Sequence, residues 1–359
     1  MLQAHSSDRF ARALISSQAT IAEAVAQLER AGTGALVLCD DERVLYGLLT
    51  DGDLRRAILR GIPFNNPCRS IANLEPVVGE VGCTAIIALG LMDHAREFVL
   101  NHLPIVDDSR KVVDLLLRSD LVSEEGIGLS AVIMAGGFGM RLRPLTDDVP
   151  KPMLKLGDRP LLELTIERLR DAGIRRMNVT THYLPEAISN HFGSGEAFDV
   201  EIRYVKEDQP LGTAGGLKLM ENCNETLLVI NGDILTEVDF RSMLRYHNEH
   251  GADLTIGVRQ HEIQVPYGVV DCDGSRVRKL QEKPLLHFLV NAGIYLLEPT
   301  VYRYIPDHHR FDMTDLIERL IDKGRHVVSF PVVEYWMDIG QKADYERAKE
   351  HVRNGGALA

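Results

Sequence analysis

The sequence predicts an α/β protein, in which a mostly parallel, helix-covered sheet follows a smaller α+β unit. Two observations carry this prediction. From about residue 130 onward, strand-like and helix-like segments alternate, as they do in parallel sheets with crossover helices. Before that point, one pattern of helix, strand, strand and helix occurs twice, which indicates a small unit built from an internal repeat. A chain of 359 residues is long enough for two such domains.

Composition narrows the class of protein. Apolar residues make up 45% of the chain and charged residues 26%, as in ordinary globular proteins. The net charge of −12 argues against nucleic-acid or anionic-membrane partners, so an anionic ligand would need a local group of cations. The five cysteines form no CxxC pair, and no apolar run approaches the length of a membrane span. We therefore expect a cytoplasmic protein without a zinc site or a disulfide framework.

The repeat in the first part has a constant spacing in its second half. The two copies lie in residues 20–58 and 84–122, and from the paired aspartates onward their positions match at an offset of 67 residues. Each copy has a helical pattern, a strand-like run that ends in two aspartates, a second strand-like run, and an Asp-Leu pair that opens a helix. That pair begins at Asp53 in the first copy and at Asp120 in the second. An aspartate at a helix start is by its chemistry first a cap.

These two copies resemble a pair of CBS motifs, and we assign residues 1–124 to a CBS pair with a regulatory role. The segment GLLTDGDL at 47–54 matches the part that cradles an adenine nucleotide in many members of that family. The resemblance implies that Thr50 and Asp53 contact the ribose and phosphate of such a nucleotide. A purely structural or oligomer-forming role of the pair is an equally good interpretation.

The second copy departs from the nucleotide-binding pattern. Asp114 takes the place of Gly47, and Leu117 takes the place of Thr50. These differences remove a flexible backbone position and a hydroxyl group. At most one nucleotide site is therefore expected in this unit.

A second domain is predicted over residues 130–354, after a linker at 121–130 that combines glycines, serines and acidic residues. Its strand-like segments are 131–135, 176–183, 201–207, 226–232, 252–259 and 326–332. Its helix-like segments are 161–173, 185–192 and 240–250. In a sheet of this kind, ligands bind beyond the carboxyl ends of the strands.

The first strand of this domain leads into a glycine-rich turn, AVIMAGGFGMRLRP at 131–144. Glycines let backbone N–H groups approach phosphate oxygens closely. The dinucleotide fingerprint GxGxxG fails because Leu142 stands at the third glycine position, and no Gly-Lys-Ser/Thr follows as in a Walker A loop. Two later cations, Arg141 and Lys151, would instead neutralise a triphosphate as it is attacked.

With PLTDDVPKPMLKLGDRPLLE at 144–163 attached, the turn resembles the sugar-phosphate nucleotidyltransferases. These enzymes join a nucleoside triphosphate to a sugar 1-phosphate and release pyrophosphate. The resemblance covers nearly all of 130–354 and implies a Rossmann-like sheet. It also implies catalytic cations and a turn that binds the nucleotide. The cations are Arg141, Lys151 and Lys283, and the turn residues are Ala135, Gly136, Gly137, Gly139 and Met140.

The segment EDQPLGTAGGLKLM at 207–220 has the composition expected for base recognition, because a Gly-Thr-Ala-Gly turn has little side-chain bulk and exposes backbone N–H and C=O groups. The resemblance places it beside the nucleobase and implies contacts from Glu207, Gly212, Thr213 and Ala214. PLGTAG is similar to the guanylyl-transferring branches, whereas the Gly-Leu-Ala-Gln type of the thymidylyl enzymes is missing. A loop with a helix cap and no base contact is the other interpretation.

Two aspartates are candidates for binding magnesium. Asp233 directly follows a buried-looking strand, where an acid is costly unless it is solvated, capped or metal-bound. The resemblance implies a Mg²⁺ ligand at this position and a second one at Asp338. Two carboxylates leave most of the octahedral shell to water and substrate phosphates, as magnesium prefers. Each aspartate taken alone could also be a helix cap.

Three further segments are assigned to the sugar 1-phosphate. The resemblance implies a sugar pocket lined by Gly268, Asn291 and Gly293. It also implies that Glu282 accepts a hydrogen bond from a sugar hydroxyl and that Lys283 holds the 1-phosphate. Alternatively, Glu282 and Lys283 form an exposed ion pair and Gly293 marks a strand bulge.

The sequence favours GTP and glucosamine 1-phosphate as substrates. A CBS pair joined to this type of domain is similar to the glucosamine-1-phosphate guanylyltransferases of nonulosonic acid pathways. Mannose 1-phosphate with GTP, or another hexose 1-phosphate with UTP or dTTP, stays open. A non-catalytic nucleotide sensor is a hypothesis of another class, and the presence of every phosphate-binding cation and both aspartates disfavours it. We also expect a homo-oligomer, since CBS pairs often associate.

Overall fold

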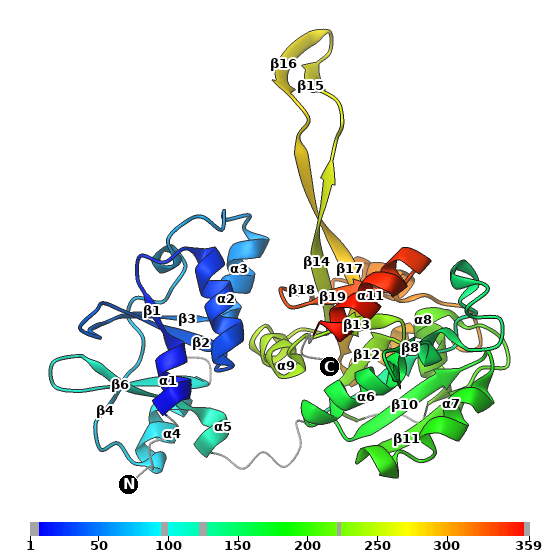
Figure 1. Cartoon of the computed structure of the whole chain (residues 1–359), viewed down its shortest axis with the longest axis horizontal. Coiled ribbons are helices and arrows are strands. Elements are labelled where there is room, and N and C mark those ends of the chain that lie inside the picture. Colours follow the sequence, from blue (N-terminus) through cyan, green and yellow to red (C-terminus); the bar gives the residue numbers. More distant parts are fainter. Residues whose placement is uncertain (1–6, 95–99, 122–127, 221–223, 355–359) are drawn as a thin grey trace. The chain divides into compact units, whose positions relative to one another are not determined.

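The computed structural model describes residues 7–94, 100–121, 128–220 and 224–354. The chain divides into two compact units, Met1–Glu125 and Gly126–Ala359, shown in Figure 1. Residues 122–127 of the predicted linker lie outside the described residues, as does the predicted domain end at residue 124. Within the described ranges, no helix combines the length and the apolar character needed to cross a bilayer.

The first unit consists of two small three-stranded sheets with their helices. The first half contains α1 (Ser7–Ala13), β1 (Leu14–Ser16), α2 (Ile21–Ala31), β2 (Ala35–Cys39), β3 (Leu45–Thr50) and α3 (Asp51–Leu59). The second half contains β4 (Gly79–Glu80), α4 (Ala85–His94), β5 (His102–Val106), β6 (Val112–Leu117) and α5 (Arg118–Leu121). In both sheets the first two strands pair in parallel and the last two antiparallel, so the two halves share one topology.

The predicted repeat is confirmed down to its turns. The strand pairs β2–β3 and β5–β6 are related by the same 67-residue offset. Asp40 Oδ1 accepts the backbone N–H groups of the residues two and four positions further on, and Asp107 Oδ1 does the same. Arg43 and Arg110 follow them with φ of 66° and 60°. The aspartates therefore close the same Asx-type turn in both copies.

The second unit contains a seven-stranded sheet in the order β11-β10-β7-β12-β17-β14-β18. Its strands are β7 (Ser130–Met134), β10 (Arg176–Thr181), β11 (Glu201–Lys206), β12 (Leu227–Asn231), β14 (Leu254–Gln264), β17 (Leu285–Leu297) and β18 (Val327–Pro331). Only β17 runs antiparallel to its neighbours. The predicted mostly parallel α/β sheet is thus confirmed, and all six predicted strands are present.

Strand β17 was not predicted from the sequence. Its outer half is exposed, its inner half is buried, and Gly293 interrupts it, so no single hydrophobic period covers its length. Its segments were therefore interpreted separately, as parts of a sugar site. The structure unites them in one long strand.

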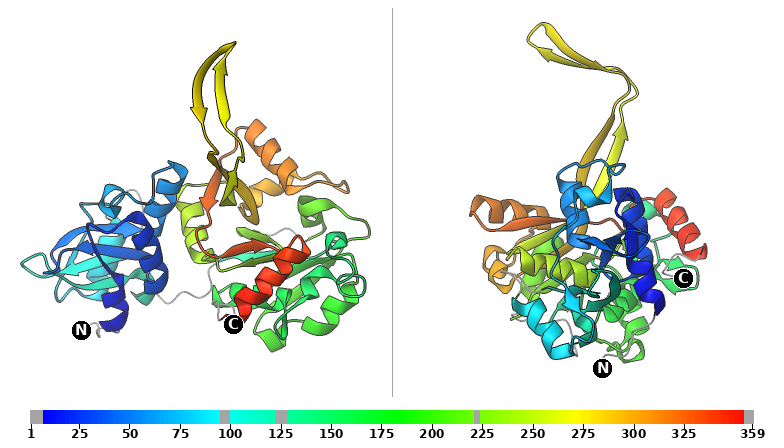
Figure 2. Two further views of the ribbon diagram at one scale, coloured as in Figure 1. Left: turned by 45° about the horizontal axis from the view of Figure 1, so that its top comes forward. Right: turned by 90° about the vertical axis from the view of Figure 1, so that its left-hand side faces the viewer.

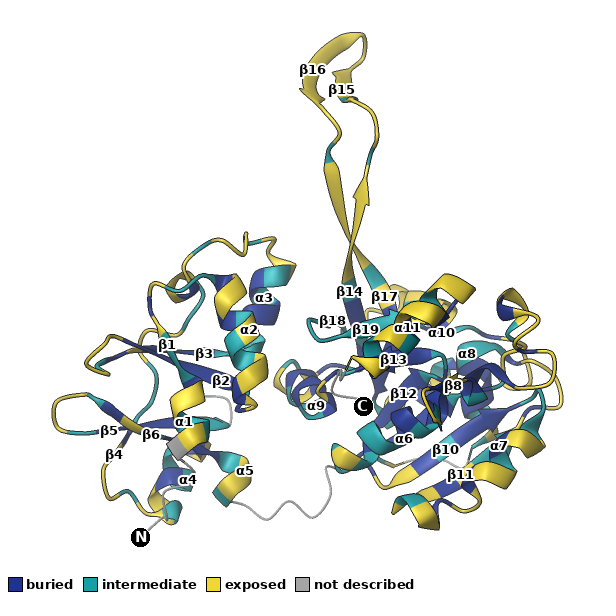
Figure 3. Cartoon of the chain, viewed as in Figure 1, coloured by how far each residue is buried: buried dark blue, intermediate teal, exposed yellow. Residues whose placement is uncertain are grey.

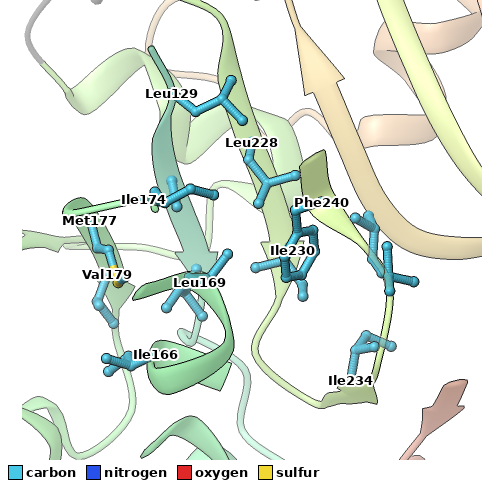
Figure 4. Packing of buried hydrophobic residues seen from close by; sticks show 14 of the residues in the cluster. Leu129, Ile166, Leu169, Ile174, Met177, Val179, Leu228, Ile230, Ile234 and Phe240 are labelled. Atoms are coloured by element: carbon cyan, nitrogen blue, oxygen red, sulfur yellow. The ribbon is translucent and has the colours of Figure 1, made fainter. Parts of the chain in front are cut away.

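Helices cover both faces of the sheet. On one face, α6 (Leu161–Asp171), α7 (Pro185–Phe192) and α9 (Phe240–Glu249) pack on a common core. Figure 4 shows part of it, with Leu169 of α6 among residues of β10 and β12. Leu162, Ile166 and Leu169 of α6 recur at helical spacing and are fully buried, which explains why this segment is a helix. On the other face, α8 (Gly212–Gly215) and α10 (Met313–Asp322) cover a second core.

Small sheets extend the carboxyl edge of the main sheet. β13 (Ile234–Thr236) pairs with β19 (Trp336–Asp338), and β8 (Lys155–Leu156) pairs with β9 (Arg159–Pro160). The last helix, α11 (Lys342–Arg353), packs on these additions through Tyr345, Ala348 and Val352.

A two-stranded arm leaves the same edge of the sheet. We use this name for residues 259–290, which comprise the outer parts of β14 and β17 and the hairpin β15 (Val269–Asp273)–β16 (Arg276–Gln281). In both views of Figure 2 the arm (yellow) projects away from the body of its unit. Figure 3 shows that its surface is almost wholly exposed.

Candidate active site

The glycine-rich turn begins where β7 ends. Gly139 has φ of 63°, and a Cβ added there would lie 3.0 Å from Thr146 Cγ2 and 3.2 Å from Lys151 Cβ. The Thr146 hydroxyl donates to the carbonyl oxygen of Gly139 at 2.9 Å. Backbone conformation and close packing therefore both require glycine at this position, which holds the turn against Lys151. At Gly137 an added Cβ would meet no atom within 4 Å, so a ligand has room to approach that backbone.

Two carboxylates lie at the same edge. The Gly232 N–H donates to the carbonyl oxygen of Met134 at 2.9 Å, which joins the end of β12 to the end of β7 and places Asp233 beside the turn. Asp338 is paired with Ile234 in the small β13–β19 ladder. The two aspartates are far apart in sequence, and this ladder makes them neighbours.

Two cations complete this group. Lys151 Nζ lies 2.5 Å from Asp233 Oδ2 and 4.0 Å from Asp338 Oδ1, although Lys151 is only 8% exposed. The Arg141 guanidinium and the Asp338 carboxylate both lie within 4 Å of the position of a Cβ on Gly340. Burial of a charged side chain is costly unless such partners surround it. The structure therefore brings together four site residues that were predicted from separate segments: Arg141, Lys151, Asp233 and Asp338.

The electrostatics of the group suit a bound cation. Burial raises the pKa of Asp338, and the negative charge of Asp233 raises it further, against the effects of Lys151 and Arg141. The two carboxylates flank one ammonium group, and carboxylate oxygens are donors that Mg²⁺ prefers. No third His, Cys, Asp or Glu joins them in the part of the chain that the structure describes. Asp233 and Asp338 are thus the residues that would hold a magnesium ion, with water and phosphate oxygens completing its shell.

Glu207 occupies the space between the glycine turn and the PLGTAG segment. It is 6% exposed and accepts the backbone N–H of Leu211 at 3.0 Å. Its Oε1 atom lies 3.6 Å and 2.9 Å from the positions of a Cβ on Gly136 and on Gly216, so both glycines make room for the carboxylate. Burial raises the pKa of Glu207, while the hydrogen bond from Leu211 opposes this rise.

The Gly-Thr-Ala-Gly turn is less open than the sequence predicted. The Thr213 N–H donates to Asp312 Oδ1 at 3.1 Å, and the N–H groups of Ala214 and Gly215 donate to the Phe311 carbonyl oxygen at 3.0 and 2.9 Å. The expectation that this turn presents free N–H groups to a base is therefore wrong for these three residues. Their hydrogen bonds tie the turn to the start of α10. Base recognition by this segment stays a prediction.

Asn291 and Gly293 lie at the base of the arm, beside the end of β12. Gly293 has φ of 70°, its N–H donates to Asn291 Oδ1 at 3.0 Å, and a Cβ there would lie 2.7 Å from Asn231 Nδ2. The register passes from Ile256↔Tyr295 to Val258↔Asn291, so β17 has additional residues here. Gly293 thus lies in a strand bulge, as one interpretation of the sequence predicted, and that bulge borders the site.

Gly268, Glu282 and Lys283 form a separate group. They lie at the waist of the arm, which we define as residues 265–268 and 282–284, between the β14–β17 ladder and the β15–β16 hairpin. A Cβ on Gly268 would lie 3.1 Å from Glu282 Oε2, so these two residues face each other, and Lys283 has φ of 44°.

The waist is distant from the base of the arm. From Val258 to Gln264, strand β14 pairs with β17 without interruption. An antiparallel strand advances about 3.4 Å per residue, so this stretch spans about 20 Å. The structure therefore does not bring Gly268, Glu282 and Lys283 together with Asn291 and Gly293.

Several side chains around the turn were not singled out from the sequence. The Phe138 ring lies 5.3 Å from the His182 ring and 5.6 Å from the Tyr183 ring. The Tyr183 hydroxyl donates to the Asp147 carbonyl oxygen at 2.7 Å, and His182 Nδ1 lies 2.8 Å from the Glu207 carbonyl oxygen. These contacts support the turn from β10. The pair of aromatic residues directly after a strand was the available signal.

Asn231, the last residue of β12, was also missed. Its Oδ1 atom is buried, and the described residues offer it no hydrogen-bond donor. Such an acceptor two residues before Asp233 and beside Gly293 is costly unless a ligand or water satisfies it.

A family model described as nucleotidyl transferase matches residues 130–355 of this chain. The chain belongs to the nucleotidyl transferase family. A UTP–glucose-1-phosphate uridylyltransferase of Synechocystis sp. is 35% identical over 241 residues, which cover 61% of this chain and 62% of that protein. Mannose-1-phosphate guanylyltransferase 1 of Arabidopsis thaliana is 35% identical over 232 residues, which cover 60% of this chain and 63% of that protein. The matches thus span less than two thirds of the length of these relatives.

A solved structure supports the fold of the nucleotidyl transferase unit. It is a crystal structure of a Bacillus anthracis protein described as a glucose-1-phosphate thymidylyltransferase, with a TM-score of 0.52 and 24% sequence identity. The match covers 63% of this chain and 96% of that chain.

The first unit has its own match. A CBS domain model matches residues 13–60, which contain the first copy of the repeat. Within that copy, Thr50 Oγ1 accepts the Asp53 N–H at 3.2 Å, and Asp53 Oδ2 accepts the Thr50 N–H at 2.9 Å, which forms a capping box at the start of α3. Arg56 also donates to the Asp53 carboxylate. The interpretation of Asp53 as a helix-capping residue is thus confirmed, and its contact with a nucleotide stays a prediction.

Proposed function

We propose that this member of the nucleotidyl transferase family transfers a nucleotidyl group from a nucleoside triphosphate to a sugar 1-phosphate, with release of pyrophosphate. One observation carries the proposal. Arg141, Lys151, Asp233 and Asp338 converge beside a glycine turn at the carboxyl edge of the sheet. Backbone N–H groups and two cations suit a triphosphate, and the two carboxylates suit its counterion.

The reaction needs no nucleophile from the protein. A phosphate oxygen of the sugar 1-phosphate attacks the α-phosphorus and forms a new P–O bond, while the bond from that phosphorus to the bridging oxygen of pyrophosphate breaks. Negative charge builds on the α-phosphoryl oxygens and on the leaving group. Arg141 and Lys151 neutralise that charge, and one such preorganised contact is typically worth about 3–4 kcal/mol in the transition state. A magnesium ion at Asp233 and Asp338 would supply further neutralisation when bound.

The nucleotide that we propose is GTP. Guanine carries adjacent N–H donors on one edge, and a carboxylate can accept both of them. Glu207 is a buried carboxylate between the glycine turn and the PLGTAG segment, and we assign the two hydrogen bonds from guanine to it. The Arabidopsis relative is named a guanylyltransferase and the Synechocystis relative a uridylyltransferase, so UTP is the main competitor.

The acceptor that we propose is a hexose or hexosamine 1-phosphate, with glucosamine 1-phosphate as the first choice and mannose 1-phosphate as the second. Both relatives quoted above are named for hexose 1-phosphates. Asn291, Gly293 and the unsatisfied Asn231 Oδ1 offer polar backbone and side-chain groups for sugar hydroxyls beside the aspartates.

A substrate panel tests the proposal. Pyrophosphate release is measured with GTP, UTP, dTTP, CTP and ATP against glucosamine, mannose and glucose 1-phosphates, with Mg²⁺ and after its removal by a chelator. We expect release with GTP and a hexosamine or hexose 1-phosphate, and loss of release without metal. Release with UTP or dTTP alone would contradict the base assignment. Nucleotide binding without release by any pair would favour a nucleotide sensor instead.

For the first unit we propose an adenine nucleotide as ligand, held by Thr50 and Asp53. The CBS match over residues 13–60 supports this proposal, and the nucleotide would have to share these side chains with the capping box.

A further inference from the structure

The outer hairpin of the arm has one apolar side that nothing in its own unit covers. In the β15–β16 hairpin, Val270 pairs with Leu280, and Cys272 pairs with Val277. Val270, Leu280 and Val277 are 50%, 65% and 59% exposed. Side chains of directly opposed residues share a face of a ribbon, so these four residues form one apolar face.

The opposite face of the same hairpin is charged. Asp271 is paired with Lys279, and Asp273 with Arg276, in the same ladder, and Arg278 donates to the Asp273 carboxylate. The hairpin is therefore amphipathic in the manner of a strand pair with one buried face.

Closer to the base, both faces of the β14–β17 ladder carry exposed apolar side chains. Ile263 is paired with Leu286, and His261 with Phe288, on one face, whereas Leu285 and Leu289 lie on the other. Ile263, Leu286 and Phe288 are 47%, 39% and 48% exposed. An isolated two-stranded ribbon is marginally stable in water, and apolar surface of this extent marks a surface that another molecule covers.

The waist residues point to that molecule. Gly268, Glu282 and Lys283 are predicted to bind the sugar 1-phosphate, yet they are held about 20 Å from the base of the chain's own arm. The ladder between base and waist is continuous, and Arg259 anchors the base by donating to the carbonyl oxygens of Val332 and Glu334 at 2.8 Å each. If the waist were to reach the site of its own chain, the pairing between β14 and β17 would have to break.

We propose that the arm is exchanged between two copies of this chain. The apolar face of its outer hairpin packs on the second copy, and its waist delivers Glu282 and Lys283 to the sugar-phosphate side of that copy's site. A two-fold axis makes the exchange reciprocal, so each of the two sites contains an arm from the other copy. The ammonium of Lys283 meets an edge that already holds Asp233 and Asp338 and would bind phosphate. This inference rests on the proposed function for its chemistry but not for its geometry.

A mixing experiment tests the exchange through activity. Asp233→Ala inactivates the chain's own site, and Lys283→Ala inactivates the arm. If arms are exchanged, half of the randomly reassorted dimers are mixed and each of these has one complete site, so the mixture of two inactive variants regains about one quarter of wild-type activity. A mixture of Asp233→Ala with Lys151→Ala, which both affect the same site, is the control and stays inactive. No recovery in the first mixture would overturn the proposal, because it would place the arm on its own site.

A second measurement is independent of catalysis. The mass of the wild-type chain is determined by light scattering, and a photo-crosslinking benzophenone amino acid replaces Leu280 in a mixture of isotope-labelled and unlabelled chains. We expect a dimer and crosslinks between labelled and unlabelled chains, with peptides near Asp233 or Asp338 as the acceptors. The double variant Val277→Glu/Leu280→Glu is expected to be monomeric with an unchanged circular dichroism spectrum. A monomeric wild type, or crosslinks only within a chain, would overturn the exchange even if the transferase activity is present. A crosslinked dimer without activity would instead leave the exchange standing and refute the proposed function.

Discussion

At the scale of single residues, the site depends on a few partly or wholly buried charged side chains that form ion pairs with one another. Lys151 is held between two carboxylates at 2.5 and 4.0 Å, and the low exposure of its side chain makes these contacts strong. In the proposed reaction a triphosphate competes with Asp233 for this lysine. The same ammonium group therefore neutralises Asp233 in the structure and the phosphate charge in the transition state.

The first prediction concerns this lysine. Lys151→Ala should lower kcat/KM for pyrophosphate release about 100- to 1000-fold, because a preorganised charge contact to the transition state is lost. Lys155→Ala is the matched control, since Lys155 is an exposed lysine that lies close to Lys151 in the sequence. Steady-state kinetics with both variants checks the prediction. A Lys151→Ala enzyme within about tenfold of wild type would contradict the assigned role.

The second prediction concerns a buried histidine away from the site. His247 in α9 lies 2.7 Å from Thr255 Oγ1 and 3.2 Å from Glu298 Oε1. Burial lowers the pKa of His247 below its ordinary value of 6.5, and the hydrogen bond to Glu298 opposes the effect. Between the lowered pKa and 6.5 the unfolded chain binds more protons than the folded one, so stability rises with pH through this window.

Denaturant unfolding of wild type and His247→Gln at a series of pH values below 7 checks this prediction. The wild type should lose free energy of unfolding as the pH falls below about 6.5, and the variant should lose less. His261→Gln, on the exposed arm, should follow the wild type. Equal pH dependence in wild type and His247→Gln would show that this histidine titrates alike in both states.

At the scale of elements, the carboxyl edge is built by short additions to a regular sheet. The sequence predicted the regular strands and helices because their hydrophobic periods are clear. It did not predict β17, because its pattern changes from buried to exposed along its length. Nor did it predict that the N–H groups of the PLGTAG turn are taken by residues 311–312, since this contact joins segments almost 100 positions apart.

The third prediction tests the bulge in β17. Gly293→Ala should destabilise the protein by about 1–2 kcal/mol through its left-handed backbone and by about 1–3 kcal/mol more through its contact with Asn231. Gly274→Ala separates the two effects. Gly274 has φ of 58°, but an added Cβ there meets nothing within 4 Å.

Thermal or chemical unfolding compares these two variants. Gly274→Ala should show the backbone effect alone. Equal losses of unfolding free energy in the two variants would mean that Asn231 at the end of β12 moves to accommodate the new methyl group. Asn231 would then not hold the bulge in place.

At the scale of the whole molecule, a repeated small unit is joined to a nucleotidyl transferase unit. The two copies of the repeat have the same turns and strand pairings, yet only the first has a hydroxyl group at its last strand end. Any nucleotide bound by this unit should therefore depend on one copy.

The fourth prediction follows from this asymmetry. Calorimetry should detect binding of an adenine nucleotide to the full chain, and Asp53→Ala should weaken it by about tenfold, the loss of one net hydrogen bond to a charged group. Asp120→Ala, at the equivalent position of the second copy, should leave binding unchanged. A melting curve of each variant separates loss of the helix cap from loss of ligand contact. A wild type that binds no adenine nucleotide would contradict a sensing role.

The sequence by itself determined the division into a repeat and an α/β unit, the strands with regular periods, and the residue types of the phosphate and metal group. These follow from local periodicity, from turn chemistry and from residues such as glycine that have few alternatives. Only the tertiary structure decided which of those residues meet. Arg141, Lys151, Asp233 and Asp338 converge because β7 and β12 are adjacent and β13 pairs with β19, whereas Glu282 and Lys283 are carried outward on a continuous ladder. Long-range strand pairing sets such distances, and no local pattern in the chain encodes it.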